Sequence, residues 1–169
     1  MAEATIAEIT QYLTFKLDDE VFALDIGKVR EVLDYTSITK VPRTPEFMRG
    51  VINLRGSVVP VVDLRLKFGM SKTEKTVNTC IIIVEVTVDE ETTVLGALAD
   101  SVQEVLDLEP GNIEPAPKIG TRLNTEFIKG MGKRDNRFIM ILDIDKIFST
   151  DELALVQETK EQAPPAEER

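Results

Sequence analysis

Two stretches of this chain align with each other without a gap, eighty residues apart. Residues 46–68 read EFMRGVINLRGSVVPVVDLRLKF, and residues 126–148 read EFIKGMGKRDNRFIMILDIDKIF. Five aligned positions are identical, and most of the others keep the residue type, as where Arg49 aligns with Lys129. Repetition at a fixed spacing is typical of a repeated structural unit. The chain is therefore predicted to contain two versions of one fold unit.

The duplication extends toward the N-terminus at an offset of seventy-three residues. There, residues 29–33 (VREVL) match residues 102–106 (VQEVL), and the apolar run 21–24 matches the run 94–97. The expected bounds are residues 11–150 for the folded domain, about 11–70 for the first copy and about 79–150 for the second.

The two ends of the chain lie outside this repeat. Residues 1–10 lack a sustained apolar period and are expected to be flexible. Near the other end, Ser149 and Glu152 form an S-x-x-E capping box, which predicts the start of a helix. Residues 151–169 are expected to hold this helix, to about Thr159, followed by a disordered tail that reads QAPPAEER.

Short apolar runs rich in β-branched residues dominate both copies and predict strands. The clearest are residues 51–54 and 58–62, which flank the turn sequence RGS and predict a tight hairpin with the glycine in the turn. Pro60 cannot donate a backbone hydrogen bond, so the second of these strands is expected at a sheet edge that is open to a partner. Further strands are predicted at residues 12–17, 21–24, 29–35, 80–87, 94–99 and 102–108.

One helical turn is predicted after the first hairpin. Residues 63–68 (DLRLKF) begin with an acid and are followed by Gly69, a common helix stop. A polar linker over residues 70–78 then leads into the second copy. The chain is therefore expected to be mainly β, with short helices and one C-terminal helix.

The residue types that most enzymatic mechanisms need are missing or isolated. The chain has no histidine, the commonest general base and metal ligand. Its single cysteine, Cys80, heads an apolar run and is expected to be structural rather than reactive. Asp143 and Asp145 resemble the start of a calcium loop, but the required glycine and closing glutamate are absent. We therefore expect no enzymatic activity, no cofactor and no bound metal.

Charge and hydropathy limit the partners of the chain. Its net charge is −10 and its pI is about 4.6, so general nucleic-acid binding is not expected. The opening MAEATIAEIT does not resemble a signal peptide, and the longest apolar runs are too short to cross a bilayer. We expect a cytoplasmic protein without membrane insertion, whose partner is another protein.

Charge is distributed unevenly between the two copies. Residues 40–68 hold six basic and two acidic side chains, whereas residues 77–117 hold nine acidic side chains and no Lys or Arg. Two interpretations stay open. The acidic segment is either a solvated face, or the two copies present different surfaces to different partners.

Three runs of the sequence together identify a family. They read FALDIGKVREVL at residues 22–33, VPRTPEFMRGVINLRGSVVPVVDLRLKFG at residues 41–69, and GALADSVQEVLDLEP at residues 96–110. These runs closely resemble the CheW family of chemotaxis coupling proteins, and NLRG at residues 53–56 is the sharpest part of the match. The similarity covers residues 11–150 in order.

This resemblance implies two SH3-like β-barrels that arise from the internal duplication. It also implies a non-catalytic adaptor that links the cytoplasmic tips of chemoreceptors to the regulatory domain of the histidine kinase CheA, at membrane-bound receptor arrays. In the family, a groove between the barrels takes the helical hairpin tip of the receptor. Carried over to this sequence, the receptor- or kinase-binding residues are Val29, Glu31, Val32, Gly50, Asn53, Arg55, Gly56, Val102 and Val105. No short motif marks the kinase surface, which stays unassigned.

Two alternative functions stay open from the sequence. One is a scaffold of a chemosensory pathway that controls surface movement or gene expression instead of motility. The other is an unrelated β-barrel that binds a small ligand.

Overall fold

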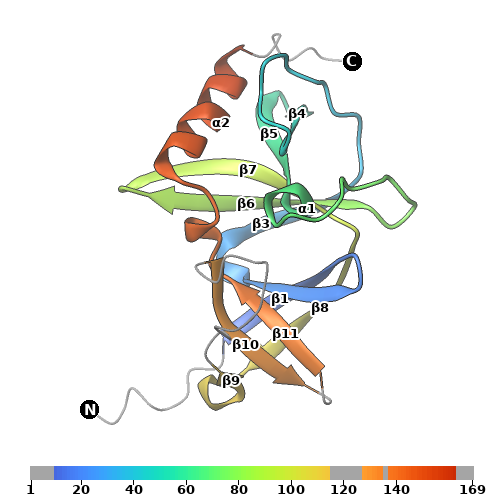
Figure 1. Ribbon diagram of the computed structural model, residues 1–169, viewed down its shortest axis with the longest axis vertical. Coiled ribbons are helices and arrows are strands. Elements are labelled where there is room, and N and C mark those ends of the chain that lie inside the picture. Colours follow the sequence, from blue (N-terminus) through green and yellow to red (C-terminus); the bar gives the residue numbers. More distant parts are fainter. Residues whose placement is uncertain (1–9, 115–126, 135–136, 163–169) are drawn as a thin grey trace.

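The computed structural model describes residues 10–114, 127–134 and 137–162 of the chain. Within them the chain forms two curled β-sheets, a few short helical turns and a C-terminal helix (Figure 1). This confirms the prediction of a mainly β protein with short helices. The predicted flexible N-terminus up to residue 9, the turn at residues 135–136 and the tail from residue 163 lie outside the described residues.

The first sheet, in the lower part of Figure 1, has six strands. They are β1 (Thr10–Leu17), β2 (Glu20–Asp25), β8 (Ser101–Leu108), β9 (Ile113–Glu114), β10 (Ile128–Arg134) and β11 (Arg137–Leu142). Their order across the sheet is β8-β1-β2-β11-β10-β9.

The second sheet has five strands. They are β3 (Val29–Asp34), β4 (Met48–Leu54), β5 (Ser57–Asp63), β6 (Cys80–Val88) and β7 (Glu91–Ala99). Their order is β3-β6-β7-β5-β4. The helical elements are α1 (Leu64–Lys67), α2 (Thr150–Gln162) and the 3-10 turns η2 (Ile26–Lys28), η3 (Pro110–Asn112) and η5 (Ile144–Lys146).

Each sheet contains strands from both copies of the repeat. Strands β1 and β2 of the first copy lie between β8 and β11 of the second, while β6 and β7 of the second copy lie between β3 and β5 of the first. The register repeats as well. Ala23 pairs with Ile141 in one sheet, and the equivalent residues Gly96 and Val61 pair in the other. Equivalent hairpins have therefore exchanged places, and neither copy forms a sheet by itself.

The alternation of side chains along the strands separates three apolar cores. The inside of the first curled sheet holds Tyr12, Ala23, Leu106, Leu108, Ile139 and Ile141. The inside of the second holds Ile52, Val59, Val61, Ile81, Ile83 and Leu98. Because of the exchanged hairpins, both interiors are filled by side chains from both copies.

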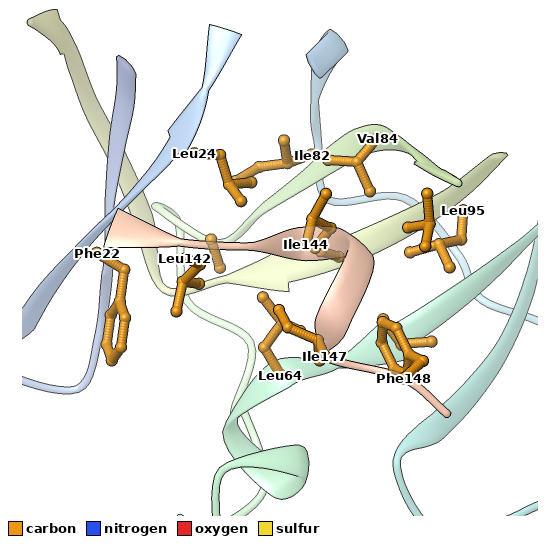
Figure 2. Close-up of a cluster of buried hydrophobic side chains, with 14 of the residues drawn as sticks. Phe22, Leu24, Leu64, Ile82, Val84, Leu95, Leu142, Ile144, Ile147 and Phe148 are labelled. Atoms are coloured by element: carbon orange, nitrogen blue, oxygen red, sulfur yellow. The ribbon is translucent and has the colours of Figure 1, made fainter. Parts of the chain in front are cut away.

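The third and largest core lies between the two sheets, where α1, η5 and α2 also contribute (Figure 2). On β6, Ile82 and Val84 belong to this shared core, while Ile81 and Ile83 belong to the interior of their own sheet. A strand that is buried on both faces reads as an unbroken apolar run. Because each Å² of buried apolar surface contributes about 25 cal/mol, the shared core stabilises the contact between the two sheets.

The C-terminal helix α2 begins with the predicted capping box. The Glu152 N–H donates to Ser149 Oγ at 3.1 Å, and the Ser149 N–H donates to Glu152 Oε1 at 2.9 Å. Leu153 and Val156 bury one side of the helix in the shared core. In addition, Lys67 Nζ donates to both carboxylate oxygens of Glu152, at 2.9 and 2.7 Å. The C-terminal helix is therefore bound to α1 of the first copy.

The Lys67 ammonium group lies among phenylalanine rings from both copies. It is 5.5, 5.8 and 5.7 Å from the ring centroids of Phe47, Phe127 and Phe148. The Phe47–Phe148 contact, with centroids 5.8 Å apart, is repeated by the equivalent Phe127–Phe68 contact at 5.5 Å. Lys67 thus occupies the place where the two copies meet.

The predicted helical turn and the linker after it are built around Asp63. This buried carboxylate caps α1 by accepting from the Arg65 N–H at 3.1 Å, and α1 is followed by Gly69 at a φ of +83°. Asp63 also accepts from Arg49 Nη1 at 3.1 Å and from both the N–H and the hydroxyl of Thr73, at 3.0 and 2.7 Å. The linker is therefore held against the first hairpin.

The expectation that β5 is an open edge strand is wrong. It pairs with β4 on one side and with β7 on the other. Pro60 lies opposite Val51 of β4, and the pairing of β5 with β7 begins only at the next residue, Val61. The proline, which has no N–H to donate, is therefore tolerated at this position. The strands at the ends of the two sheets are β3, β4, β8 and β9. Among the described residues, no helix is both long enough and apolar enough to span a membrane.

Candidate functional site

The nine residues predicted to bind a receptor or kinase lie on two equivalent strands and one hairpin. β3 carries Val29, Glu31 and Val32, β8 carries Val102 and Val105, and β4 with its turn carries Gly50, Asn53, Arg55 and Gly56. Strands β3 and β8 occupy equivalent positions in the two copies, and each is at the end of its sheet. The structure therefore divides the predicted site between both sheets.

Cys80 lies at the start of β6, beside the end of β3. It pairs with Asp34 of β3, and its thiol donates to the Asn78 backbone oxygen at 3.3 Å. Burial raises the pKa of the Cys80 thiol, the Val102 hydrogen bond opposes this, and the Asp34 charge adds to the rise. The thiol is therefore held protonated. Sequence reasoning missed that Cys80 lies beside the end of β3, because no local signal links residue 80 to residue 34.

Val32 and Val105 are the most exposed apolar residues of the predicted site. Their side chains are 40% and 46% exposed. The two positions are equivalent in register as well, since Val32 pairs with Ile82 of β6 and Val105 pairs with Leu13 of β1. Exposed apolar side chains on edge strands favour contact with a partner. These two valines are therefore the apolar anchors that the site offers.

Val29 and Val102 lie deeper than the sequence led us to expect. Both are half-buried, and both pack against the shared core between the sheets. That they line a groove stays a prediction, and one side of each valine is already covered by the shared core. A β-bulge interrupts the pairing between Val29 and Glu31, and an equivalent bulge lies on β8.

Arg55 and Glu31 form an ion pair between the β4–β5 turn and β3. Two guanidinium nitrogens take part, with Nη1 at 3.4 Å from Oε1 and Nη2 close to Oε2. The hydrogen bond from Arg55 lowers the pKa of Glu31, against a smaller opposing effect of burial, and the charge of Arg55 lowers it further. Arg55 is 69% exposed, so its guanidinium can also be reached by a partner. The ion pair therefore joins the two ends of the second sheet, β3 and the turn that follows β4.

The turn that presents Arg55 has the conformation of a tight hairpin. Arg55 and Gly56 have φ values of +52° and +89°, the left-handed region used by two-residue hairpin loops. Asn53 Oδ1 accepts a hydrogen bond from the Gly56 N–H at 2.8 Å. This confirms the predicted hairpin and gives Asn53 and Gly56 the task of shaping the turn.

Gly50 is buried, and its conformation requires glycine. Its φ is +141°, and a Cβ atom there would lie 2.1 Å from the backbone oxygen of Thr39. Thr39 and Val51 exchange two backbone hydrogen bonds, at 2.8 and 2.9 Å, directly beside it. Gly50 therefore lets the loop of residues 35–47 lie against β4, which is a structural task.

Across the described ranges, no three Cys, Asp or Glu side chains gather closely enough to hold a metal ion. Asp143, which the sequence compares with a calcium ligand, instead accepts from the Asp145 N–H at 3.2 Å and caps η5.

This chain is similar to known proteins by family model, by sequence and by structure. The CheW-like domain family model matches residues 11–152. The "Chemotaxis protein CheW" of Klebsiella aerogenes is 38% identical over 146 residues, which cover 86% of each chain. The protein of the same name from Thermotoga maritima is 36% identical over 140 residues, covering 81% of this chain and 86% of the relative.

A solved structure has the same fold. The scaffolding protein TtCheW from Thermoanaerobacter tengcongensis superposes with a TM-score of 0.75 at 38% sequence identity, over 86% of this chain and 91% of that one. Family model, sequence relatives and solved structure agree over nearly the whole described chain. This chain therefore belongs to the CheW-like domain family.

Proposed function

We propose that this chain is a non-catalytic chemotaxis adaptor that couples transmembrane chemoreceptors to the histidine kinase CheA. Its family, and relatives named as chemotaxis and scaffolding proteins, support this proposal. The observation that carries it is the pair of exposed valines, Val32 and Val105, at equivalent positions on edge strands of the two sheets. Such a protein works at the cytoplasmic tips of receptors in membrane-bound arrays and needs no cofactor.

The receptor tip would bind across β3 and β8, the end strands that carry the two exposed valines. An apolar face of its helical hairpin would cover Val32 and Val105, which supplies the apolar centre of an interface. The ion pair of Glu31 and Arg55 adjoins Val32 and would form part of the polar rim. Val29 and Val102 support the anchors from below by packing on the shared core.

The kinase would dock on other surfaces, and the charges available for this are fewer than the sequence indicates. Of the basic residues in segment 40–68, Arg49, Arg55, Arg65 and Lys67 all have carboxylate partners within the chain. The pair of Arg65 and Asp100, at 2.6 Å, even joins this basic segment to the acidic one. The remaining free charges would support head-to-tail docking of the kinase regulatory domain, in which salt weakens the binding.

Of the two alternative functions, the barrel that binds a small ligand has little support. The interiors of both sheets are filled by apolar side chains of both copies. A scaffold in a pathway that controls surface movement or gene expression would use the same geometry as a chemotaxis adaptor. Only the identity of the receptor and kinase distinguishes these two.

The test is reconstitution of receptor tip, CheA and this chain, read as recruitment of the chain to receptor and as kinase activity. Val32→Asp and Val105→Asp are each expected to weaken receptor binding at least about thirtyfold, the value of an apolar anchor at an interface centre. The matched control is Val77→Asp, because Val77 is 99% exposed and lies in the linker. Binding that survives both substitutions, with the control unchanged, would refute the proposed receptor site.

A further inference from the structure

A second concave surface lies between the loop of residues 35–47 and the region of α1 and the linker. It is a hollow of about 400 Å³, within the usual range of about 300 to 1,000 Å³ for ligand sites. None of its lining residues belongs to the nine predicted site residues. The residues that matter for its chemistry are apolar Tyr35, Ile38 and Leu66 and basic Lys40, Arg49 and Lys72.

Both walls of this hollow are fixed by hydrogen bonds before any ligand arrives. In the loop, Thr39 is paired with Val51, and the Tyr35 N–H donates to the Thr79 oxygen at 3.2 Å. On the other side, Thr73 ties the linker to the buried Asp63. The hollow is therefore a pre-formed feature of the fold, and binding there would need little ordering of the chain.

The hollow carries a surplus of positive charge in a chain of net charge −10. Arg49 is engaged by Asp63, but Lys40 and Lys72 are exposed and form no ion pair with any described residue. Arg43 lines an adjoining hollow that shares Lys40 with the first. The only carboxylate in the lining is that of the exposed Glu46. These unpaired lysines contrast with the four basic residues of segment 40–68 that form ion pairs within the chain.

We propose that this hollow binds an acidic segment of a protein partner, with its carboxylates on Lys40 and Lys72 and an apolar side chain against Tyr35 and Ile38. The two ammonium groups come from different parts of the chain, the loop and the linker, and apolar residues line the same hollow. A single exposed ion pair contributes little, so a free inorganic anion gains little here. A peptide that offers several carboxylates and an apolar group at once uses the whole lining.

This inference does not rest on the proposed coupling function, because none of the residues involved belongs to the receptor site. The test uses the complete chain labelled with ¹⁵N and the synthetic peptide acetyl-Glu-Glu-Leu-Glu-Glu-amide. Saturable NMR shifts are expected at the amides of the loop and around Lys72. The peptide acetyl-Gln-Gln-Leu-Gln-Gln-amide, without charge, is expected to bind at least about fivefold more weakly.

Matched variants decide whether the named lysines recognise the peptide. Lys40→Gln with Lys72→Gln is expected to lower the affinity about fivefold. Lys129→Gln with Lys146→Gln removes the same charge from exposed lysines outside the hollow and should change the affinity less than about twofold. All four lysines are exposed, so both variants should melt as the unmodified chain does.

Three outcomes would overturn the proposal. Equal binding of the glutamine peptide would show that carboxylates are not recognised. Equal losses in the two double variants would show that only the overall charge matters. Equal shifts with citrate in place of the peptide would show that the hollow takes a free anion rather than a peptide segment.

Discussion

Replacing Gly50 with alanine tests whether this residue serves the fold or a partner. The added Cβ would meet the Thr39 backbone oxygen at 2.1 Å, and the φ of +141° is one that alanine rarely adopts. The unfavourable backbone conformation costs about 1 to 2 kcal/mol. Displacing Thr39 also breaks its two hydrogen bonds with Val51, each worth about 1 kcal/mol. We therefore expect Gly50→Ala to destabilise the chain by about 3 to 4 kcal/mol.

The measurement is the free energy of unfolding, from urea titration and thermal melting. For a chain of this length, the expected loss corresponds to a fall in Tm of roughly 6 to 16 °C. Gly69→Ala is the matched control, because Gly69 also has a positive φ, +83°, but nothing lies within 4 Å of an added Cβ. That control should cost only the conformational term, about 1 to 2 kcal/mol.

The comparison of the two variants separates the two explanations. If Gly50→Ala is no more destabilising than Gly69→Ala, the close approach of Thr39 does not matter and the reasoning is refuted. If Gly50→Ala melts normally yet fails to bind receptor or kinase, Gly50 is a contact residue as the family resemblance implies. The expected result is loss of binding only in proportion to loss of folded protein.

Three further substitutions test the ion pairs and the core. Arg55→Glu should weaken receptor coupling while leaving the melting temperature nearly unchanged, since the pair is exposed. The swap Glu31→Arg with Arg55→Glu restores the pair, and full recovery of coupling would show that Arg55 acts only within the chain. Glu152→Gln should lower stability at pH 7. Burial alone would raise the pKa of Glu152, but hydrogen bonds from Lys67 and from the Ser149 backbone lower it overall. The carboxylate therefore stabilises the fold above its ordinary pKa of about 4.3, and this advantage is lost as pH falls below it. Urea unfolding from pH 7 to pH 3 checks this, and a difference independent of pH would contradict it. Val29→Asp should unfold the chain substantially by placing a charge against the shared core, whereas near-normal melting with lost receptor binding would restore Val29 to the exposed site.

Local sequence signals predicted the individual elements well. The capping box of Ser149 and Glu152 forms both expected hydrogen bonds, and α1 is capped by Asp63 and ends before Gly69 as predicted. These features depend on a few neighbouring residues, whose conformational preferences act wherever the segment lies in the fold. The tight turn at Arg55 and Gly56 was predictable for the same reason.

Contacts between distant residues were predicted poorly. The pairing of Glu31 with Arg55 and the burial of Val29 depend on how far the second sheet curls. The prediction of an open sheet edge at Pro60 was wrong because the sequence does not show that β7 pairs with β5 from Val61, one residue after the proline. The sequence pointed to Val32 and Val105 as equivalent positions, but their exposure is decided by the tertiary structure, in which each lies on the end strand of its sheet.

The sequence by itself determined the duplication, the strands and helices, the turn chemistry and the family. Only the tertiary structure decided that equivalent hairpins exchange places, so that each sheet is built from both copies. The physical reason is that the two copies have the same alternation of apolar residues and the same register. The pair of Ala23 with Ile141 and the pair of Gly96 with Val61 are equivalent, so partners from either copy satisfy the local pattern equally. Which copy supplies the partner strand depends on the apolar surface that the two sheets bury against each other. No single segment of the sequence contains that surface.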